Sequence, residues 1–120
     1  MATYITSPTI IKPVGNKPKV IQEYVGLVNS KTSSVSIAHM KSSAGWIEPA
    51  QMPEFDEYTL VLRGELHVKT EDSTIIVKAG EAVIAHRGER IQYSTPHSEG
   101  AEYVAICLPA FSPYTVHREE

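Results

Sequence analysis

The sequence has a single cysteine, Cys107, and lacks both long apolar stretches and runs of basic side chains. One cysteine forms no internal disulfide, which favours a reducing compartment. The apolar stretches are far shorter than the roughly 20 residues that cross a bilayer. Residues 1–20 also lack the basic start and apolar segment of a secretory signal. We therefore expect a soluble cytoplasmic protein with no membrane partner.

The charged residues argue against a nucleic-acid partner as well. The 11 Lys and Arg residues are scattered along the chain, and 14 Asp and Glu residues give a formal net charge of −3. A phosphate backbone is bound by Lys and Arg side chains that gather in a stripe. The sequence has no such stripe, so we expect no nucleic acid to bind.

The length of 120 residues is typical of one domain with a hydrophobic core of its own. We expect a single domain over residues 1–120, with a barrel core over 35–108. Prolines limit hydrogen bonding in sheets, so their density at both ends predicts an N-terminal arm over 1–20 and an extended C-terminal tail over 109–120. The arm and the tail either lie on the chain's own barrel or contact a partner subunit, and on this basis we expect a homodimer.

The core segment has short runs of alternating apolar residues about ten residues apart, with Gly, Pro or Asp at the joints. This pattern predicts an all-β barrel or sandwich without helices. One turn is expected at Arg63–Gly64, between strands over 58–62 and 65–69. Residues 23–29 form either a further strand or part of the arm.

Gly45 begins a segment whose spacing resembles the first motif of the cupin family. That motif consists of a glycine, five residues, His-any-His, three or four residues, a glutamate, six residues and a glycine. Gln51 and Pro53 occupy the two histidine places, Glu57 the glutamate place and Gly64 the final glycine.

A second segment, beginning at Gly80, resembles the second cupin motif. That motif consists of a glycine, five residues, Pro-any-Gly, two residues, a histidine, three residues and an asparagine. Gly88 is retained, whereas His86, Ile91 and Thr95 replace the proline, the histidine and the asparagine.

The resemblance spans about residues 35–108, most of the chain, and identifies it as resembling a small cupin, a double-stranded β-helix or jelly-roll barrel. The string from Glu54 to Val68 is also similar to the cupin domain of the ethanolamine-utilisation protein Q group, which likewise lacks the histidines. That resemblance implies a link to small-carbon metabolism and acetate activation. The sequence itself has no glycine-rich phosphate loop that would support a kinase.

A typical cupin holds a divalent transition metal with three histidines and one glutamate. Of these places only Glu57 is kept; Gln51 offers an amide oxygen, and Pro53 and Ile91 offer no donor. We therefore expect no cofactor, although a rearranged metal site around Gln51 and Glu57 stays open. The further residues that such a site would recruit are His39, Glu48 and His97.

Strand alternation predicts which side chains face the inside of the barrel. Ile91, Tyr93 and Thr95 share one face of a strand, and Glu57 and Thr59 share one face of another. The result is a mostly apolar cavity with a few polar groups, which is typical of a small-molecule site. The expected substrate-binding residues are Trp46, Glu48, Gln51, Thr59, Ile91 and Thr95.

Glu57 and Tyr93 are the candidate catalytic residues. Burial without a metal raises the pKa of a carboxyl group, which suits Glu57 to acid or base catalysis near neutral pH. Tyr93 would donate a hydrogen bond to a developing oxyanion. Together they favour proton transfer next to a carbonyl group, as in an isomerase or lyase. Two other functions stay open: a ligand-binding or sensor cupin without chemistry, and a structural dimerisation module.

Overall fold

The structure is a computed structural model that describes residues 1–119, and within them it contains strands and no helix. The expected all-β class is confirmed. No helix in this part of the chain is long and apolar enough to cross a membrane. The strands are β1 (Thr9–Ile11), β2 (Lys19–Val25), β3 (Ser36–Ser42), β4 (Trp46–Ile47), β5 (Asp56–Lys69), β6 (Thr74–Lys78), β7 (Ala82–Ala85), β8 (Gln92–Thr95) and β9 (Ala101–Leu108).

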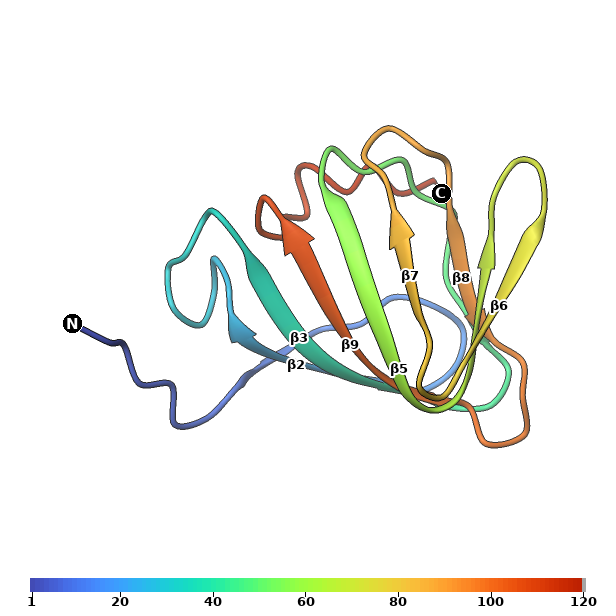
Figure 1. The fold of residues 1–120 in the computed structure, drawn as a ribbon, viewed down its shortest axis with the longest axis horizontal. Helices are drawn as coiled ribbons and strands as arrows, with labels where there is room; N and C mark the ends of the chain where they lie inside the picture. Colours follow the sequence, from blue (N-terminus) through green and yellow to red (C-terminus); the bar gives the residue numbers. More distant parts are fainter. Residues whose placement is uncertain (120) are drawn as a thin grey trace.

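All strand pairs are antiparallel, and the sheet curls so that its two ends face each other. The strand order is β1-β2-β3-β9-β5-β8-β4, and β6 and β7 also pair with β5. Figure 1 shows β2, β3, β9, β5 and β7 side by side in one layer, with β6 and β8 at the far end of the row. Hydrogen bonds from the arm to the segment around Ile47, such as the bond from Asn16 N to Ile47 O (3.3 Å), join the two ends of the sheet.

Strand β5 belongs to both halves of the sheet, and this corrects the turn expected at Arg63–Gly64. Its first part pairs with β7 and β9, and its second part pairs with β6 and β8. A shift of register between Val61 and Arg63 and a φ of 73° at Gly64 bend the strand without ending it. The strand therefore contributes side chains to both the cavity and the hydrophobic core.

The arm and the tail both form hydrogen bonds with the chain's own barrel. β1 pairs with β2 and β2 with β3, so the sheet begins before the predicted core start at residue 35. In the tail, Thr115 O accepts a hydrogen bond from Glu54 N (2.9 Å), and Arg118 forms a β-bridge with Gln51. Whether either segment also contacts a second subunit stays a prediction.

The hydrophobic core fills the end of the barrel formed by the second part of β5. Trp46, Val61, Leu66 and Val68 have no exposed surface. A smaller cluster around Phe55 packs under the tail. Burial of apolar surface contributes roughly 25 cal/mol per Å², so both clusters stabilise the fold.

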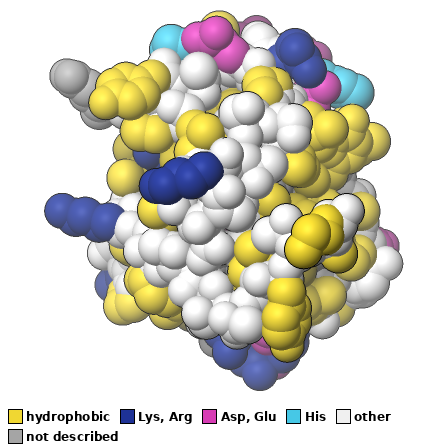
Figure 2. Space-filling view, turned by 90° about the vertical axis from the view of Figure 1, so that its left-hand side faces the viewer, with side chains coloured by type: hydrophobic (Ala, Val, Ile, Leu, Met, Phe, Trp, Pro, Cys, Tyr) yellow, Lys and Arg dark blue, Asp and Glu magenta, His cyan; other side chains and the backbone are white. Residues whose placement is uncertain are grey.

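The outer surface has mixed character. Figure 2 shows the side toward the N-terminus, where hydrophobic side chains are interspersed with separate Lys and Arg side chains and acidic groups lie at the upper edge. Such a face has no field of a single sign that would attract a polyanion.

Candidate ligand-binding site inside the barrel

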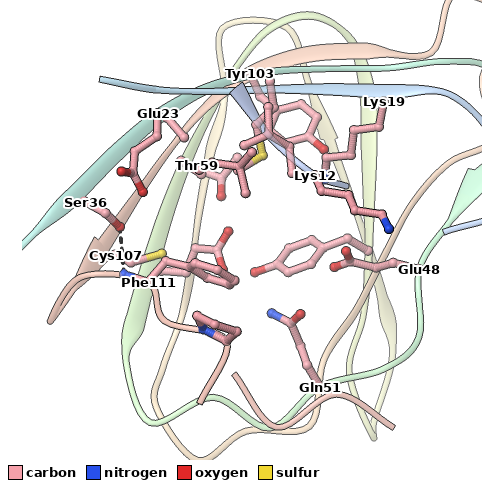
Figure 3. A pocket seen from close by; sticks show the side chains of 18 of the residues that line it. Lys12, Lys19, Glu23, Ser36, Glu48, Gln51, Thr59, Tyr103, Cys107 and Phe111 are labelled. Carbon is pink, nitrogen blue, oxygen red and sulfur yellow. Dashed lines mark hydrogen bonds between the residues drawn. The ribbon is translucent and has the colours of Figure 1, made fainter. Parts of the chain in front are cut away.

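A cavity of about 260 Å³ lies inside the barrel, between the two ends of the curled sheet. Its lining comes from β1, β2, β3, β5, β8 and β9, from the segment after β4 and from the tail. Figure 3 shows Glu48 and Gln51 on the opposite side of the cavity from Glu23 and Ser36. This arrangement encloses a small molecule on most sides, as a ligand pocket does.

Five of the predicted site residues line this cavity: Glu48, Gln51, Glu57, Thr59 and Tyr93. Glu57 and Thr59 share the inner face of β5, because alternate residues of a strand point to the same side. Tyr93 comes from β8, and Glu48 and Gln51 come from the segment after β4. Strand alternation thus identified the inner faces that supply three of these side chains.

The two motif segments meet at a β-bridge between Gln51 and Ile91. Gln51 N donates to Ile91 O at 2.8 Å, and Ile91 N donates to Gln51 O at 2.9 Å. The places of the first motif's first histidine and the second motif's histidine are therefore directly opposite each other.

Three other predicted substrate-binding residues do not line the cavity, and here the sequence interpretation needs correction. Trp46 is fully buried, and its Nε1 donates to Val14 O at 2.9 Å. Thr95 donates its hydroxyl to Ser43 O at 2.8 Å. Ile91 packs in the main core cluster. Ile91 and Thr95 face the interior as alternation predicts, but the interior around all three residues is filled.

Three side-chain atoms of the cavity lining are buried and have no hydrogen-bonding partner within residues 1–119. They are the hydroxyl oxygens of Thr59 and Tyr93 and the Nε of Arg118. The carboxyl groups of Glu48 and Glu57 line the same cavity. About nine in ten buried polar groups in proteins are paired. A cluster of three exceptions around one cavity indicates a site for water or for a polar ligand.

Burial and mutual repulsion alter the acidity of the two carboxyl groups. Desolvation, and then the nearby charge of Glu48, raise the pKa of Glu57 to about 7. Desolvation also raises the pKa of Glu48. The cations Lys19 and Arg118 oppose both increases. Near neutral pH Glu57 is therefore present in both its ionised and its protonated form.

The sequence interpretation missed the two cations in the cavity. Lys19 Nζ lies 3.9 Å from the centre of the Trp46 ring, and the Arg118 guanidinium lies 5.4 Å from that of Phe111. Lys19 shares the inner face of β2 with Ile21 and Glu23. This alternation is visible in the sequence, but the sequence interpretation placed Lys19 in the N-terminal arm. Arg118 reaches the cavity through its bridge with Gln51, a pairing over a long sequence distance that has no local signal.

Tyr93 and Cys107 both stay protonated at neutral pH. Burial, and then the charge of Glu57, raise the pKa of the Tyr93 phenol well above its usual range. The same two causes raise the pKa of the Cys107 thiol. Tyr93 is therefore a hydrogen-bond donor, and Cys107 is not an activated nucleophile because the thiolate is the reactive form.

The residues present do not fit the family's transition-metal site. Of the four ligand places, one holds the aliphatic Ile91, buried in the core, and another holds Pro53. Lys19 and Arg118 act on both carboxyl groups and would repel a divalent cation. Within residues 1–119 no three His, Cys, Asp or Glu side chains gather in a way that would hold a metal ion.

The two histidines that a rearranged metal site would recruit form contacts elsewhere. His39 contacts Gln22 Oε1 at 3.1 Å and Glu102 Oε2 at 2.7 Å. None of these three residues lines the cavity, whereas Glu57 does. His97 Nδ1 accepts a hydrogen bond from the backbone of its own loop. The absence of a cofactor nevertheless stays a prediction.

Protein purified without chelators or added metal is expected to contain far less than one equivalent of any transition metal by elemental mass spectrometry. A triple variant with Gln51→His, Pro53→His and Ile91→His restores the family's ligand types and serves as the positive control. One equivalent in the natural protein would contradict the expectation and would point to Gln51 and Glu57 as ligands.

A family model described as ethanolamine utilisation protein EutQ matches residues 15–111. The chain belongs to the EutQ family. A relative from Myxococcus xanthus, named endoribonuclease YbeY, is 42% identical over 101 residues, which are 84% of this chain and 34% of that protein. Acetate kinase EutQ of Salmonella typhimurium is 45% identical over 51 residues, which are 42% of this chain and 22% of that protein. The chain thus spans about a third or less of these relatives, and their names describe the longer proteins.

Solved structures show the fold of this EutQ-family chain. The crystal structure of a Salmonella typhimurium ethanolamine utilisation protein Q has a TM-score of 0.66 at 28% identity, over 78% of this chain and 71% of that one. The polyketide cyclase RemF from Streptomyces resistomycificus has a TM-score of 0.76 at 17% identity, over 100% and 85% of the two chains. The cupin jelly-roll fold predicted from the two motifs is confirmed.

Proposed function

We propose that this EutQ-family cupin binds a small polar organic molecule inside its barrel and exchanges a proton with it through Glu57. The observation that supports the proposal is the set of polar groups that line one cavity: the unpaired Thr59 and Tyr93 hydroxyls, the unpaired Nε of Arg118, and the carboxyl groups of Glu48 and Glu57. Leaving a buried polar group without a partner costs about 1–3 kcal/mol. A ligand with several oxygen atoms would satisfy these groups together.

The arrangement suits proton transfer next to a carbonyl group. In its ionised form Glu57 takes a proton from the carbon beside the carbonyl. The electron pair of the broken C–H bond then forms a C=C bond, and the π pair of the C=O bond moves onto the carbonyl oxygen. Tyr93 donates a hydrogen bond to that oxygen as it gains charge. The protonated Glu57 then returns the proton to another carbon or to a leaving group, which gives an isomerase or lyase reaction. A carboxyl group with a pKa of about 7 is suited to both steps.

Binding is tested by dialysing the protein against a defined mixture of hydroxy acids, keto acids, polyols and phenols, and identifying the retained compounds by mass spectrometry. The control is Ala105→Phe, because Ala105 lines the cavity and a larger side chain there would fill it. The natural protein is expected to retain a compound that Ala105→Phe releases. Equal retention by both proteins would mean that the cavity is not the site.

Proton transfer is tested with the retained compound in D₂O. The natural protein is expected to introduce deuterium beside the carbonyl group, and Glu57→Gln is expected to slow this exchange at least 100-fold while still binding the compound. No exchange by the natural protein would support the alternative, a binding or sensor cupin without chemistry. The homodimer and the cytoplasmic location stay predictions.

A further inference from the structure

The outer face of one layer of the sheet is apolar, although an antiparallel sheet usually presents polar side chains to water. The layer consists of β7, β5, β9 and β3, which lie side by side in Figure 1. Five large apolar side chains of this face are each 38–49% exposed: Tyr58, Leu60, Leu62, Ile84 and Leu108. The rest of residues 1–119 therefore leaves this face largely uncovered.

The strand registers place these side chains next to one another. Tyr58 of β5 pairs with Ile84 of β7 on one side and with Ile106 of β9 on the other. Leu60 lies two residues further along β5 and points to the same side. Directly paired residues also share one face of a sheet, so the exposures join into a single surface. We call this surface the outer patch; it consists of Tyr58, Leu60, Leu62, Ile84, Ile106 and Leu108.

The strands of the outer patch are apolar on both faces. In β9 the six residues from Tyr103 to Leu108 are all apolar, and β7 reads Ala-Val-Ile-Ala. Strands that read as continuous apolar runs are typically covered on both sides. The inner side chains of these strands face the interior of the barrel, so the pattern indicates a second layer over the outer ones.

The area of the outer patch matches what a stable dimer needs. A whole side chain of this size has a surface of roughly 200 Å², so the five that are 38–49% exposed present about 400 Å² of apolar surface. A standard interface buries about 800 Å² on each partner, and slightly more than half of that area is apolar. The outer patch therefore supplies the apolar part of one such interface.

The charges around the outer patch favour a second copy of the chain as its partner. At one end of the strands Lys41 and Arg63 both pair with Glu102 in the sheet. At the other end Arg87 Nη2 and Asp56 Oδ2 form an ion pair at 3.0 Å. Charges of both signs at each end select no strongly charged partner and do not repel an identical face. Most soluble oligomers are two-fold dimers, in which one patch meets its own copy.

We propose that two copies of this chain associate through the outer patch, with their sheets packed face to face about a two-fold axis. Sheets packed in this way lie about 10 Å apart, with strand directions within about 30° of each other. The interface is then the middle of the sheet, whereas the sequence interpretation expected a homodimer because of the arm and the tail. The proposal does not depend on the cavity, because the cavity residues Glu57 and Thr59 lie on the opposite face of β5.

Sedimentation velocity over a range of micromolar concentrations measures the association. The natural protein is expected to sediment as a dimer at the upper end of the range and to dissociate on dilution. A monomer at every concentration would overturn the proposal.

Leu60→Glu tests the centre of the outer patch. The new carboxylate would lose its water on association, so the variant is expected to dimerise about 100-fold more weakly than the natural protein. Ile76→Glu is the matched control: Ile76 is 47% exposed, as Leu60 is 46% exposed, but it lies on β6 outside the outer patch. The control is expected to dimerise like the natural protein. Unchanged dimerisation of Leu60→Glu would overturn the proposal.

Hydroxyl-radical footprinting locates the interface on the natural protein and does not depend on the folding of any variant. As the concentration rises into the dimer range, Tyr58, Leu60 and Ile84 are expected to lose reactivity, whereas Ile75 and Ile76 of β6 should keep theirs. A dimer that protects the arm or the tail and leaves Tyr58, Leu60 and Ile84 reactive would overturn the proposal and place the interface at those segments.

Discussion

Replacing Gly64 with alanine is expected to lower the free energy of unfolding by about 3 kcal/mol or more. Gly64 has a φ of 73°, a left-handed conformation that costs an alanine about 1–2 kcal/mol. A Cβ at this place would also lie 2.9 Å from the carbonyl carbon of Gly100 and overlap its oxygen. Since that neighbour is backbone of the loop that leads into β9, relief requires a shift of the β5–β9 pairing. Urea unfolding of the variant measures the loss.

The matched control is Gly80→Ala. Gly80 has a similar φ of 85°, but a Cβ there would meet no atom within 4 Å. Only the conformational cost of about 1–2 kcal/mol should appear. If the two variants lose similar amounts of unfolding free energy, close packing around Gly64 adds no cost, and the bend in β5 accommodates a methyl group.

The same bend explains why the sequence predicted a turn where the chain has a continuous strand. Residues 58–62 and 65–69 alternate on both sides of Gly64, and a glycine between two alternating runs usually marks a hairpin turn. What keeps β5 continuous is its partner: Glu102 and Ala101 of β9 pair with Arg63 and Gly64 across the bulge. Such pairing joins residues about 40 positions apart and leaves no trace in the local pattern.

The residues of the candidate site were predictable where side-chain alternation alone determines which face of a strand they lie on. Glu57, Thr59 and Tyr93 lie in strands with a clear period of two, and all three line the cavity. The same rule placed Thr95 on the inner face, but it does not give the depth at which the core ends and the cavity begins. Thr95 points inward, yet its hydroxyl is bonded to Ser43 O.

The positions of the two cations in the cavity could not be predicted from the local sequence pattern. Lys19 and Arg118 come from the two ends of the chain, where prolines obscure the strand pattern. Their position depends on how β2 and the tail pair with the rest of the barrel, and that depends on contacts far apart in sequence. The bridge between Gln51 and Ile91 likewise joins residues far apart in the sequence.

Replacing Glu57 with glutamine is expected to stabilise the protein, and only above a certain pH. The pKa of Glu57 is about 7 in the folded state, against a usual value of 4.5. Between these values the folded protein holds a proton that the unfolded chain has lost, so stability falls as the pH rises through this range. This difference in pKa corresponds to a loss of unfolding free energy of at most about 3 kcal/mol. Because the cavity is in contact with solvent, we expect a loss of about 2 kcal/mol.

Glu57→Gln removes this penalty because an amide does not ionise. At pH 8 the variant is expected to be more stable than the natural protein by about 2 kcal/mol, whereas at pH 4.5 the two should be equal. Urea unfolding at both pH values measures the difference. Glu99→Gln, at an exposed carboxyl, is the control and should change stability by less than about 0.5 kcal/mol at either pH.

A stability difference that is the same at pH 4.5 and pH 8 would mean that Glu57 ionises in the folded protein as it does in water, and the base assigned to it would lose its physical support. A difference that appears only at the higher pH would show that the fold keeps a carboxyl group where its ionised form is unfavourable. Residues that lower stability in this way are typical of functional sites, where activity and stability oppose each other. The pH dependence of stability therefore bears on function before any ligand is known.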